Sequence, residues 1–145
     1  MGLSIILKPC AGEAELFDPA ITGPFAEPMA EMANAEQVAP WCGYVARRGG
    51  VAVGFGGFKG TPDGDSGWVE IGYLTFPGNE GMGVATRVAA AMVEIARCAG
   101  VDQVCAHTLP EENASTTVLR RNGFVRVGEA TDPDEGVVWR WEKLA

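Results

Sequence analysis

Short apolar runs separated by glycine, proline and polar turns recur along most of the chain, and they predict strands. Residues 41–48 and 51–58 are two such runs, and the Gly49-Gly50 dipeptide between them is typical of a two-residue hairpin loop. Further strands are predicted at residues 4–7, 68–76, 101–109, 124–129 and 136–142. The first of these is expected to end at Lys8-Pro9.

The apolar pattern takes a helical period at residues 83–99, where Gly100 supplies a C-terminal stop. One face of this predicted helix is apolar and consists of Val84, Val88, Met92, Ile95 and Ala99. A shorter helix is predicted at residues 112–123, with Asn113 or Ser115 as its N-cap. Prolines within residues 11–37 allow one or two short helices there and exclude one long helix.

The order of these elements indicates an α/β fold. The strand at 68–76, the helix at 83–99 and the strand at 101–109 form one βαβ unit, which is expected to be parallel and right-handed. Antiparallel hairpins surround it. We therefore expect a single domain over residues 1–145, with a mixed, mostly antiparallel sheet of six to seven strands flanked by helices. The last strand is bulky and aromatic on one face and could pair with another subunit in a homodimer.

Charge limits the class of partner. The chain has 11 basic and 19 acidic residues and a net charge of −8, which repels nucleic acid. The acidic excess is concentrated in residues 1–45, so a partner that meets this segment is expected to be positively charged. A solvated acidic face explains the same excess equally well.

The remaining composition indicates a cytoplasmic protein that does not bind membranes or metals. No apolar run reaches membrane-spanning length, and the N-terminus lacks the features of a secretion signal. The four cysteines are scattered, and with the single histidine, His107, they offer no metal-ligand spacing.

The turn before the long predicted helix is a candidate anion site. Gly81 and Gly83 leave backbone N–H groups uncovered at the helix start, where the helix dipole favours a negative charge such as a phosphate. Ala85 is small, and Thr86 adds a hydroxyl. The stretch lacks both the Lys-Ser/Thr of a P-loop and a G-x-G-x-x-G sequence. A purely structural turn remains the alternative.

Three segments together resemble the GNAT superfamily of acetyl-CoA-dependent N-acetyltransferases. Glu80-Gly81-Met82-Gly83-Val84-Ala85 resembles the family's pyrophosphate motif, and "WVEIGYLTFP" resembles the strand before it. "HTLPEENASTTVLRRNGF" resembles the Asn-x-x-Ser to Gly-Phe segment of the branch that includes ribosomal-protein N-terminal acetyltransferases. The resemblance covers about residues 40–128 in the family's order.

The resemblance implies that strands 68–76 and 101–109 splay apart around acetyl-CoA, the cosubstrate. Pantetheine is then expected to lie along the backbone of Leu74, Thr75 and Phe76. Asn113 and Ser115 are expected to flank the pantetheine arm, a role that is compatible with capping of the second helix. The pyrophosphate is expected at Gly81, Met82, Gly83, Val84, Ala85 and Thr86.

Amide formation requires that the acceptor amine lose a proton, because protonated amines are not nucleophilic. Glu70 on the wedge strand is the first candidate for the base, acting directly or through a water, and His107 is its rival. A free backbone N–H around Leu74–Phe76 is expected to stabilise the oxyanion. Many relatives carry a tyrosine acid where this chain has Leu119, so Tyr73 or solvent would protonate the thiolate, or no acid is used.

These features predict acetyl transfer from acetyl-CoA to a primary amine, either on a small molecule or at a protein N-terminus. The motif's usual first residue, Gln or Arg, is Glu80 here, and a carboxylate beside a pyrophosphate must point outward or be compensated by Arg87 or Arg120. The alternative function is a catalytically silent acyl-CoA-binding sensor or partner module.

Overall fold

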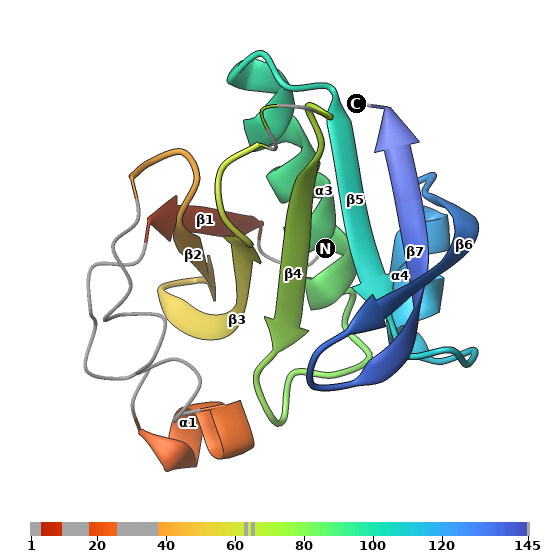
Figure 1. The fold of residues 1–145 in the computed structure, drawn as a ribbon. Coiled ribbons are helices and arrows are strands. Elements are labelled where there is room, and N and C mark those ends of the chain that lie inside the picture. Colours follow the sequence, from red (N-terminus) through yellow and green to blue (C-terminus); the bar gives the residue numbers. More distant parts are fainter. Residues whose placement is uncertain (1–3, 10–17, 26–37, 63, 65, 145) are drawn as a thin grey trace.

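The computed structural model describes residues 4–9, 18–25, 38–62, 64 and 66–144 (Figure 1). Of the region in which short helices were expected, only residues 18–25 are described; the remainder of residues 11–37 lies outside the described residues. Residues 18–25 contain α1 (Pro19–Thr22) and the 3-10 turn η2 (Gly23–Phe25). Asp18 precedes α1 and its carboxylate accepts the N–H of Ala20, as expected of a residue at a helix start.

A single mixed sheet organises the described residues, and it confirms the predicted fold class. Its seven strands are arranged in the order β1-β2-β3-β4-β5-β7-β6, with β4 and β5 parallel and the other neighbours antiparallel. The strands are β1 (Ile5–Pro9), β2 (Gly43–Arg48), β3 (Val51–Phe58), β4 (Val69–Thr75), β5 (Gln103–Thr108), β6 (Val125–Asp132) and β7 (Gly136–Leu144). The hairpin predicted around Gly49-Gly50 is the β2–β3 pair.

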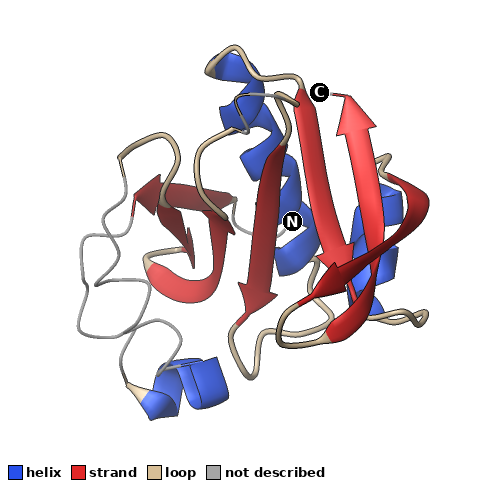
Figure 2. Ribbon diagram, viewed as in Figure 1, coloured by secondary structure: helices blue, strands red, loops and turns tan. Residues whose placement is uncertain are grey.

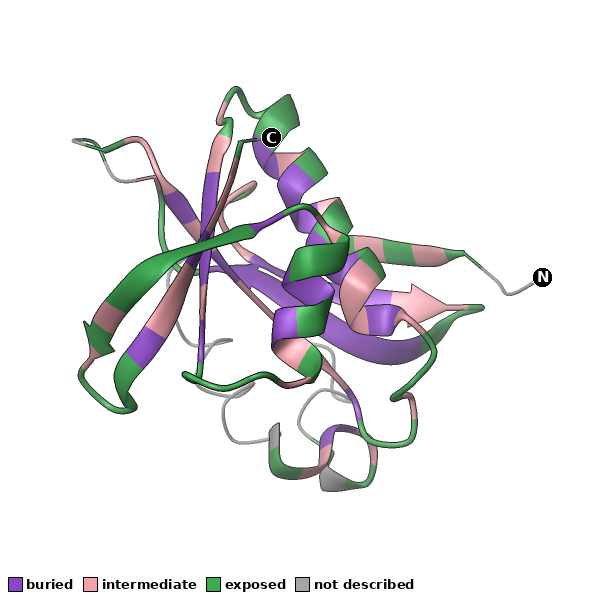
Figure 3. Ribbon diagram, turned by 90° about the vertical axis from the view of Figure 1, so that its right-hand side faces the viewer, coloured by how far each residue is buried: buried purple, intermediate pink, exposed green. Residues whose placement is uncertain are grey.

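Two helices cover one face of this sheet, and they lie behind it in Figure 2. They are α3 (Val84–Cys98) and α4 (Ala114–Arg121), close to the predicted ranges. The side of α3 that faces the sheet is buried (Figure 3) and includes Val84, Val88 and Met92. These side chains pack with the β-strands in the main hydrophobic core, as the helical period predicted. Ile95 is only partly buried and Ala99 is exposed, so the predicted face is wrong at the C-terminal end of the helix, where Ala96 is buried instead.

Glycines on β3 let α3 lie close to the sheet. A Cβ atom on Gly56 would lie 2.6 Å from Cγ1 of Val88, and one on Gly54 would lie 3.0 Å from Cγ1 of Val84. The first contact is shorter than real Cβ atoms show and the second is tighter than most, so larger residues at these positions would push the helix away. The glycines of β3 therefore set the position of the N-terminal half of α3.

Two expectations about strands were wrong. The first strand does not end at Lys8-Pro9 but continues through both residues, which pair with Val45 and Tyr44. β1 is an edge strand, where the missing N–H of a proline is tolerated. The last strand, β7, lies between β5 and β6, so both of its edges are already paired within the chain and cannot add a strand from another subunit.

Candidate active site

β4 and β5 separate soon after they begin, which confirms the predicted splay. Their parallel pairing comprises Val69 with Val104 and Glu70 with Cys105. Beyond these pairs the two strands diverge toward their C-terminal ends, as the arrowheads in Figure 1 show. The gap leaves one edge of β4 without a strand neighbour, while its other edge pairs with β3 as far as Thr75.

The backbone of β4 presents alternate peptide groups to this gap. The carbonyl of Glu70 accepts the N–H of Lys59 (2.8 Å), and the N–H of Phe76 donates to the carbonyl of Val53 (2.9 Å), so both face β3. Successive peptide groups of a strand point to opposite sides. The groups of Ile71, Tyr73 and Thr75 therefore point away from β3, toward β5 at Ile71 and toward the gap at Tyr73 and Thr75.

A cavity of about 560 Å³ occupies the region between the gap and the two helices. Its lining comes from three segments: the end of β4, the turn into α3 with the first turn of that helix, and one side of α4. Of the residues expected to bind the cosubstrate, eight line this cavity: Leu74, Thr75, Gly81, Gly83, Val84, Ala85, Thr86 and Ser115.

Three of the expected residues do not line the cavity. Phe76 is fully buried, and its N–H is bonded to Val53, so it does not offer the free donor that we expected of it. Met82 is exposed, and its carbonyl accepts a bond from the Arg48 guanidinium (3.4 Å). Asn113 is the N-cap of α4, where its side chain accepts the N–H of Thr116, which resolves the two N-cap candidates in its favour.

The turn into α3 is built as an anion site requires. Gly81 and Gly83 both have φ = +76°, a conformation that side-chain-bearing residues rarely adopt. Gly83 is the N-cap, and no side chain caps the helix there, so the first N–H groups of α3 have no side-chain partner. Glu80 also lines the cavity, and its carboxylate accepts the N–H of Gly78 at 2.8 Å.

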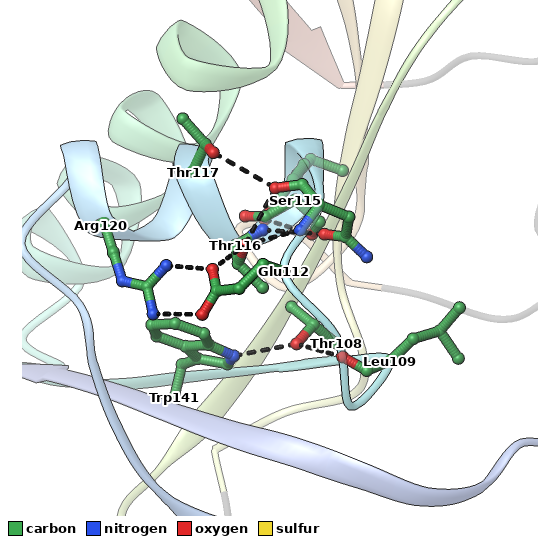
Figure 4. Close-up of polar contacts among 10 residues, drawn as sticks. Thr108, Leu109, Glu112, Ser115, Thr116, Thr117, Arg120 and Trp141 are labelled. Carbon is green, nitrogen blue, oxygen red and sulfur yellow. Dashed lines mark hydrogen bonds and ion pairs between the residues drawn. The ribbon is translucent and has the colours of Figure 1, made fainter.

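The cation that lines the cavity is Arg121, which the sequence reasoning missed. Arg120, which was expected to compensate Glu80, instead pairs with Glu112 and stacks over the ring of Trp141 at 5.1 Å (Figure 4). Arg87 remains beside the turn, since a Cβ atom on Gly83 would lie 3.8 Å from its Nη1. Arg121 follows Ala114 by seven residues, which is two helical turns, and this spacing could have placed it on the same face of α4.

The N-terminal end of α4 is fixed by a network of polar contacts (Figure 4). The indole N–H of Trp141 donates to the hydroxyl of Thr108 (3.0 Å), at the end of β5. Glu112 accepts from the hydroxyl of Thr116 (3.0 Å) and from Arg120 (2.7 Å). The Arg120 hydrogen bond is the largest influence on Glu112, and it lowers the pKa of that carboxyl to about 2.

Tyr73 spans the cavity from β4 to α4. Its hydroxyl lies 2.9 Å from Oγ of Ser115 and donates to the carbonyl of that residue at 3.1 Å. Burial raises the pKa of the Tyr73 hydroxyl, against a smaller lowering by the Ser115 bond, so the group stays protonated at neutral pH. The structure thus provides one neutral O–H donor at the place where the gap meets α4.

The two candidate bases lie together on the face of the sheet that α3 does not cover. Nδ1 of His107 is 2.9 Å from Oε2 of Glu70, and Nζ of Lys59 is 3.1 Å from the same oxygen. The side chains of Glu70 and His107 are 25% and 20% exposed. The two rival candidates for the base are therefore in direct contact.

A second cavity, of about 420 Å³, adjoins the first, and the two share Tyr73 and Leu74. Three glycines on neighbouring strands form a row across the sheet beside this cavity, because Gly57 on β3 pairs with both Gly43 on β2 and Gly72 on β4. The lining of this cavity is mostly apolar, with one cation, and consists of Phe55, Gly57, Phe58, Lys59, Gly72, Tyr73 and Leu74.

Residues 14–125 match the family model described as an acetyltransferase (GNAT) domain. The chain belongs to the GNAT acetyltransferase family. Among curated proteins, no match to this chain was found. The family assignment agrees with the resemblance seen in the motif segments.

Solved structures of other GNAT proteins share the fold. A GNAT acetyltransferase from Bacillus anthracis superposes with a TM-score of 0.77 at 17% identity, over 99% of this chain and 98% of that one. Aminoglycoside acetyltransferase AAC(6')-Ib in complex with coenzyme A and kanamycin gives 0.74 at 19% identity, over 97% and 95%. The ribosomal-protein-S5-alanine acetyltransferase of Vibrio fischeri gives 0.72 at 13% identity, over 97% and 92%.

Two further properties of this GNAT chain follow from its described residues. They contain no group of three or more His, Cys, Asp or Glu side chains that could hold a metal ion. None of the helices in the described segments is long and apolar enough to cross a membrane.

Proposed function

We propose that this GNAT protein transfers the acetyl group of acetyl-CoA to a primary amine. The observation that carries the proposal is the cavity at the β4–β5 gap, which combines a strand edge without a neighbour and a helix start without a side-chain cap. A strand edge suits an extended chain with amide groups, such as pantetheine, and a helix start suits a phosphate.

The chain's residues fit such a ligand in two parts. The N–H groups between Gly81 and Thr86 would bind the pyrophosphate, with Arg121 and Arg87 as the nearby cations. The peptide groups of β4 that face the gap would bond the pantetheine amides, and Ser115 and Leu74 would flank the arm. Phe76, Met82 and Asn113 would act indirectly, by fixing the turn and the start of α4.

In the reaction, the amine nitrogen forms a bond to the thioester carbonyl carbon and the carbon–sulfur bond breaks. The amine gives up a proton and the departing thiolate takes one. Amino groups have pKa values of about 8 to 10 and are mostly protonated at neutral pH, so a base is needed. We assign the proton removal to the Glu70–His107 pair, and Tyr73 is the proton donor nearest to the gap.

The acceptor amine would enter through the second cavity. This cavity meets the first at Tyr73 and Leu74, where a thioester at the end of the pantetheine arm would be exposed to attack. Kanamycin, bound by one structural relative, and the ribosomal protein named for another represent the small-molecule and protein classes of acceptor. Both classes belong in the acceptor screen.

The first experiment is a calorimetric titration with acetyl-CoA that compares the wild type with Gly83→Trp. Gly100→Trp is the matched control, because Gly100 also has positive φ (+85°) and open space around it but lies at the far end of α3. We expect micromolar binding by the wild type and the control, and loss of binding in Gly83→Trp.

The second experiment measures release of free CoA thiol in the presence of an amine panel. Amine-dependent release supports the enzyme. Binding without release by any amine would favour the catalytically silent acyl-CoA module, and no binding by the wild type would remove the cosubstrate from the proposal.

A further inference from the structure

We infer that His107 is the proton acceptor, through Nε2, and that Glu70 is a positioning residue that holds the imidazole ring. This inference rests on the proposed acetyl transfer and divides the work within its base pair. It follows from the placement of the two side chains around the opening of the β4–β5 gap.

One carboxylate oxygen of Glu70 is in contact with two neighbouring side chains. Nδ1 of His107 and Nζ of Lys59 both approach the same carboxylate oxygen, at 2.9 and 3.1 Å. When two N–H groups approach one carboxylate oxygen, both of its lone pairs already have a partner. Oε2 of Glu70 is therefore occupied by its two neighbours and is not free to remove a proton from a substrate.

His107 has the opposite arrangement. A neutral imidazole carries one N–H and one bare nitrogen, and the partner of one nitrogen decides which is which. With the Glu70 carboxylate beside Nδ1, the proton is held on Nδ1, and Nε2 is left with a free lone pair. A carboxylate that fixes the tautomer of a histidine base in this way raises the share of the reactive form.

The strand pairing places His107 at the beginning of the β4–β5 gap. Glu70 pairs with Cys105, so Gly72 on β4 and His107 on β5 each lie two residues beyond this last pair, where the strands begin to diverge. Gly72 has no side chain and lines the second cavity. Lys59 also lines that cavity and shares the Glu70 oxygen with Nδ1 of His107, so the imidazole is linked to the cavity lining through this carboxylate.

The other charged groups of this region have partners of their own. Asp132, which lies within electrostatic range of His107 and Lys59, accepts the backbone N–H groups of Asp134 and Glu135 through Oδ1. Arg140, which pairs with His107 in the β5–β7 ladder, donates from Nε to Glu142 at 2.7 Å, and its guanidinium lies over the ring of Trp68. Glu142 is thus a second partly buried carboxylate beside β5 with a partner other than the histidine. Glu142→Gln is the matched control for Glu70→Gln.

The tautomer can be observed directly because the chain contains a single histidine. In a long-range ¹H–¹⁵N correlation spectrum, a single imidazole gives a single pattern of cross-peaks, which needs no residue assignment and reports which nitrogen carries the proton. We expect the Nδ1–H form in the wild type and in Glu142→Gln, and a shift toward the Nε2–H form in Glu70→Gln. An Nε2–H form in the wild type would overturn the inference whether or not the protein has activity.

Turnover separates the two roles. We expect His107→Ala to lower kcat by about 10²- to 10⁴-fold with little change in acetyl-CoA affinity, as loss of a general base does. Glu70→Gln should lower kcat by about 10- to 100-fold, the worth of one hydrogen bond to a charged group. Added imidazole should restore part of the activity of His107→Ala and none of that of Glu70→Gln.

The double variant completes the test. If Glu70 acts only through His107, then Glu70→Gln should cost nothing further in the His107→Ala background. Multiplicative losses, or full activity in His107→Ala, would overturn the inference while leaving acetyl transfer in place. A wild type that binds acetyl-CoA but acetylates no amine would overturn both the inference and the proposed enzyme.

Discussion

The substitution Gly56→Ala tests whether the glycines of β3 set the position of α3. A Cβ atom at this position would lie 2.6 Å from Cγ1 of Val88 and 3.1 Å from Sδ of Met92. Carbon atoms in contact normally stand about 3.5–4.0 Å apart, so the overlap with Val88 is about 1 Å. The Met92 side chain can adjust, but a valine in a helix is held in one rotamer, so the helix itself must move.

Overpacking of this kind costs roughly 1–3 kcal/mol. For a domain of this size each kcal/mol lowers Tm by about 2–4 °C, so a fall of roughly 2–12 °C is expected in a thermal unfolding experiment. Movement of α3 also displaces the turn at Gly83, so the affinity for acetyl-CoA should weaken in the same variant.

Gly128→Ala is the control for this substitution. Gly128 lies in β6 with no atom within 4 Å of its hypothetical Cβ, so alanine there should be neutral or stabilising. Combining Gly56→Ala with Val88→Ala removes the clash, and the pair should be more stable than the sum of the two single losses. A Gly56→Ala protein as stable as the wild type would refute the account of how α3 is placed.

Two further predictions concern Tyr73 and Glu112. Tyr73→Phe removes the O–H group that contacts Ser115, and kcat should fall about tenfold while the acetyl-CoA affinity stays unchanged. This loss is smaller than that of a full general acid because a thiolate leaves readily. An unchanged kcat would assign the proton to solvent. Because the pKa of Glu112 is depressed to about 2 in the folded protein, its bond to Arg120 contributes stability above the ordinary carboxyl pKa of about 4.5 that is lost as the pH falls toward 2. The stability difference between the wild type and Glu112→Gln, from denaturant unfolding at several pH values, should therefore shrink from pH 6 to pH 2.5, and a constant difference would contradict this assignment.

The elements that the sequence predicts well depend on local signals. α3 and the β2–β3 hairpin were predicted because helical spacing, a glycine turn and a two-glycine loop are all contained in short segments. The glycine turn before α3, the candidate anion site, was predicted for the same reason, since Gly81 and Gly83 adjoin the helix they precede. The long predicted helix and the turn therefore needed no knowledge of the rest of the fold.

The missed features depend on strand order and register. Alternating aromatic residues in β7 indicate a strand but cannot tell an edge strand from a central one, which is why its proposed role in subunit pairing was wrong. The GFGGF sequence in β3 likewise gives no hint that Gly56 faces Val88 on α3. The contact between Glu70 and His107 could not be read either, because it requires the register of two strands joined by a helix.

That register also explains why the free edge of β4 begins beside the Glu70–His107 pair. Odd-numbered side chains of this strand, such as Ile71 and Tyr73, face the helices, while Glu70 belongs to the opposite face with Gly72. A slip of one residue would bury Glu70 under α3 and bring Ile71 beside His107. β5 leaves β4 immediately after the Glu70–Cys105 pair, so the first peptide groups of β4 without a strand partner adjoin the Glu70 carboxylate. A ligand that occupied this free edge would therefore end next to the Glu70–His107 pair.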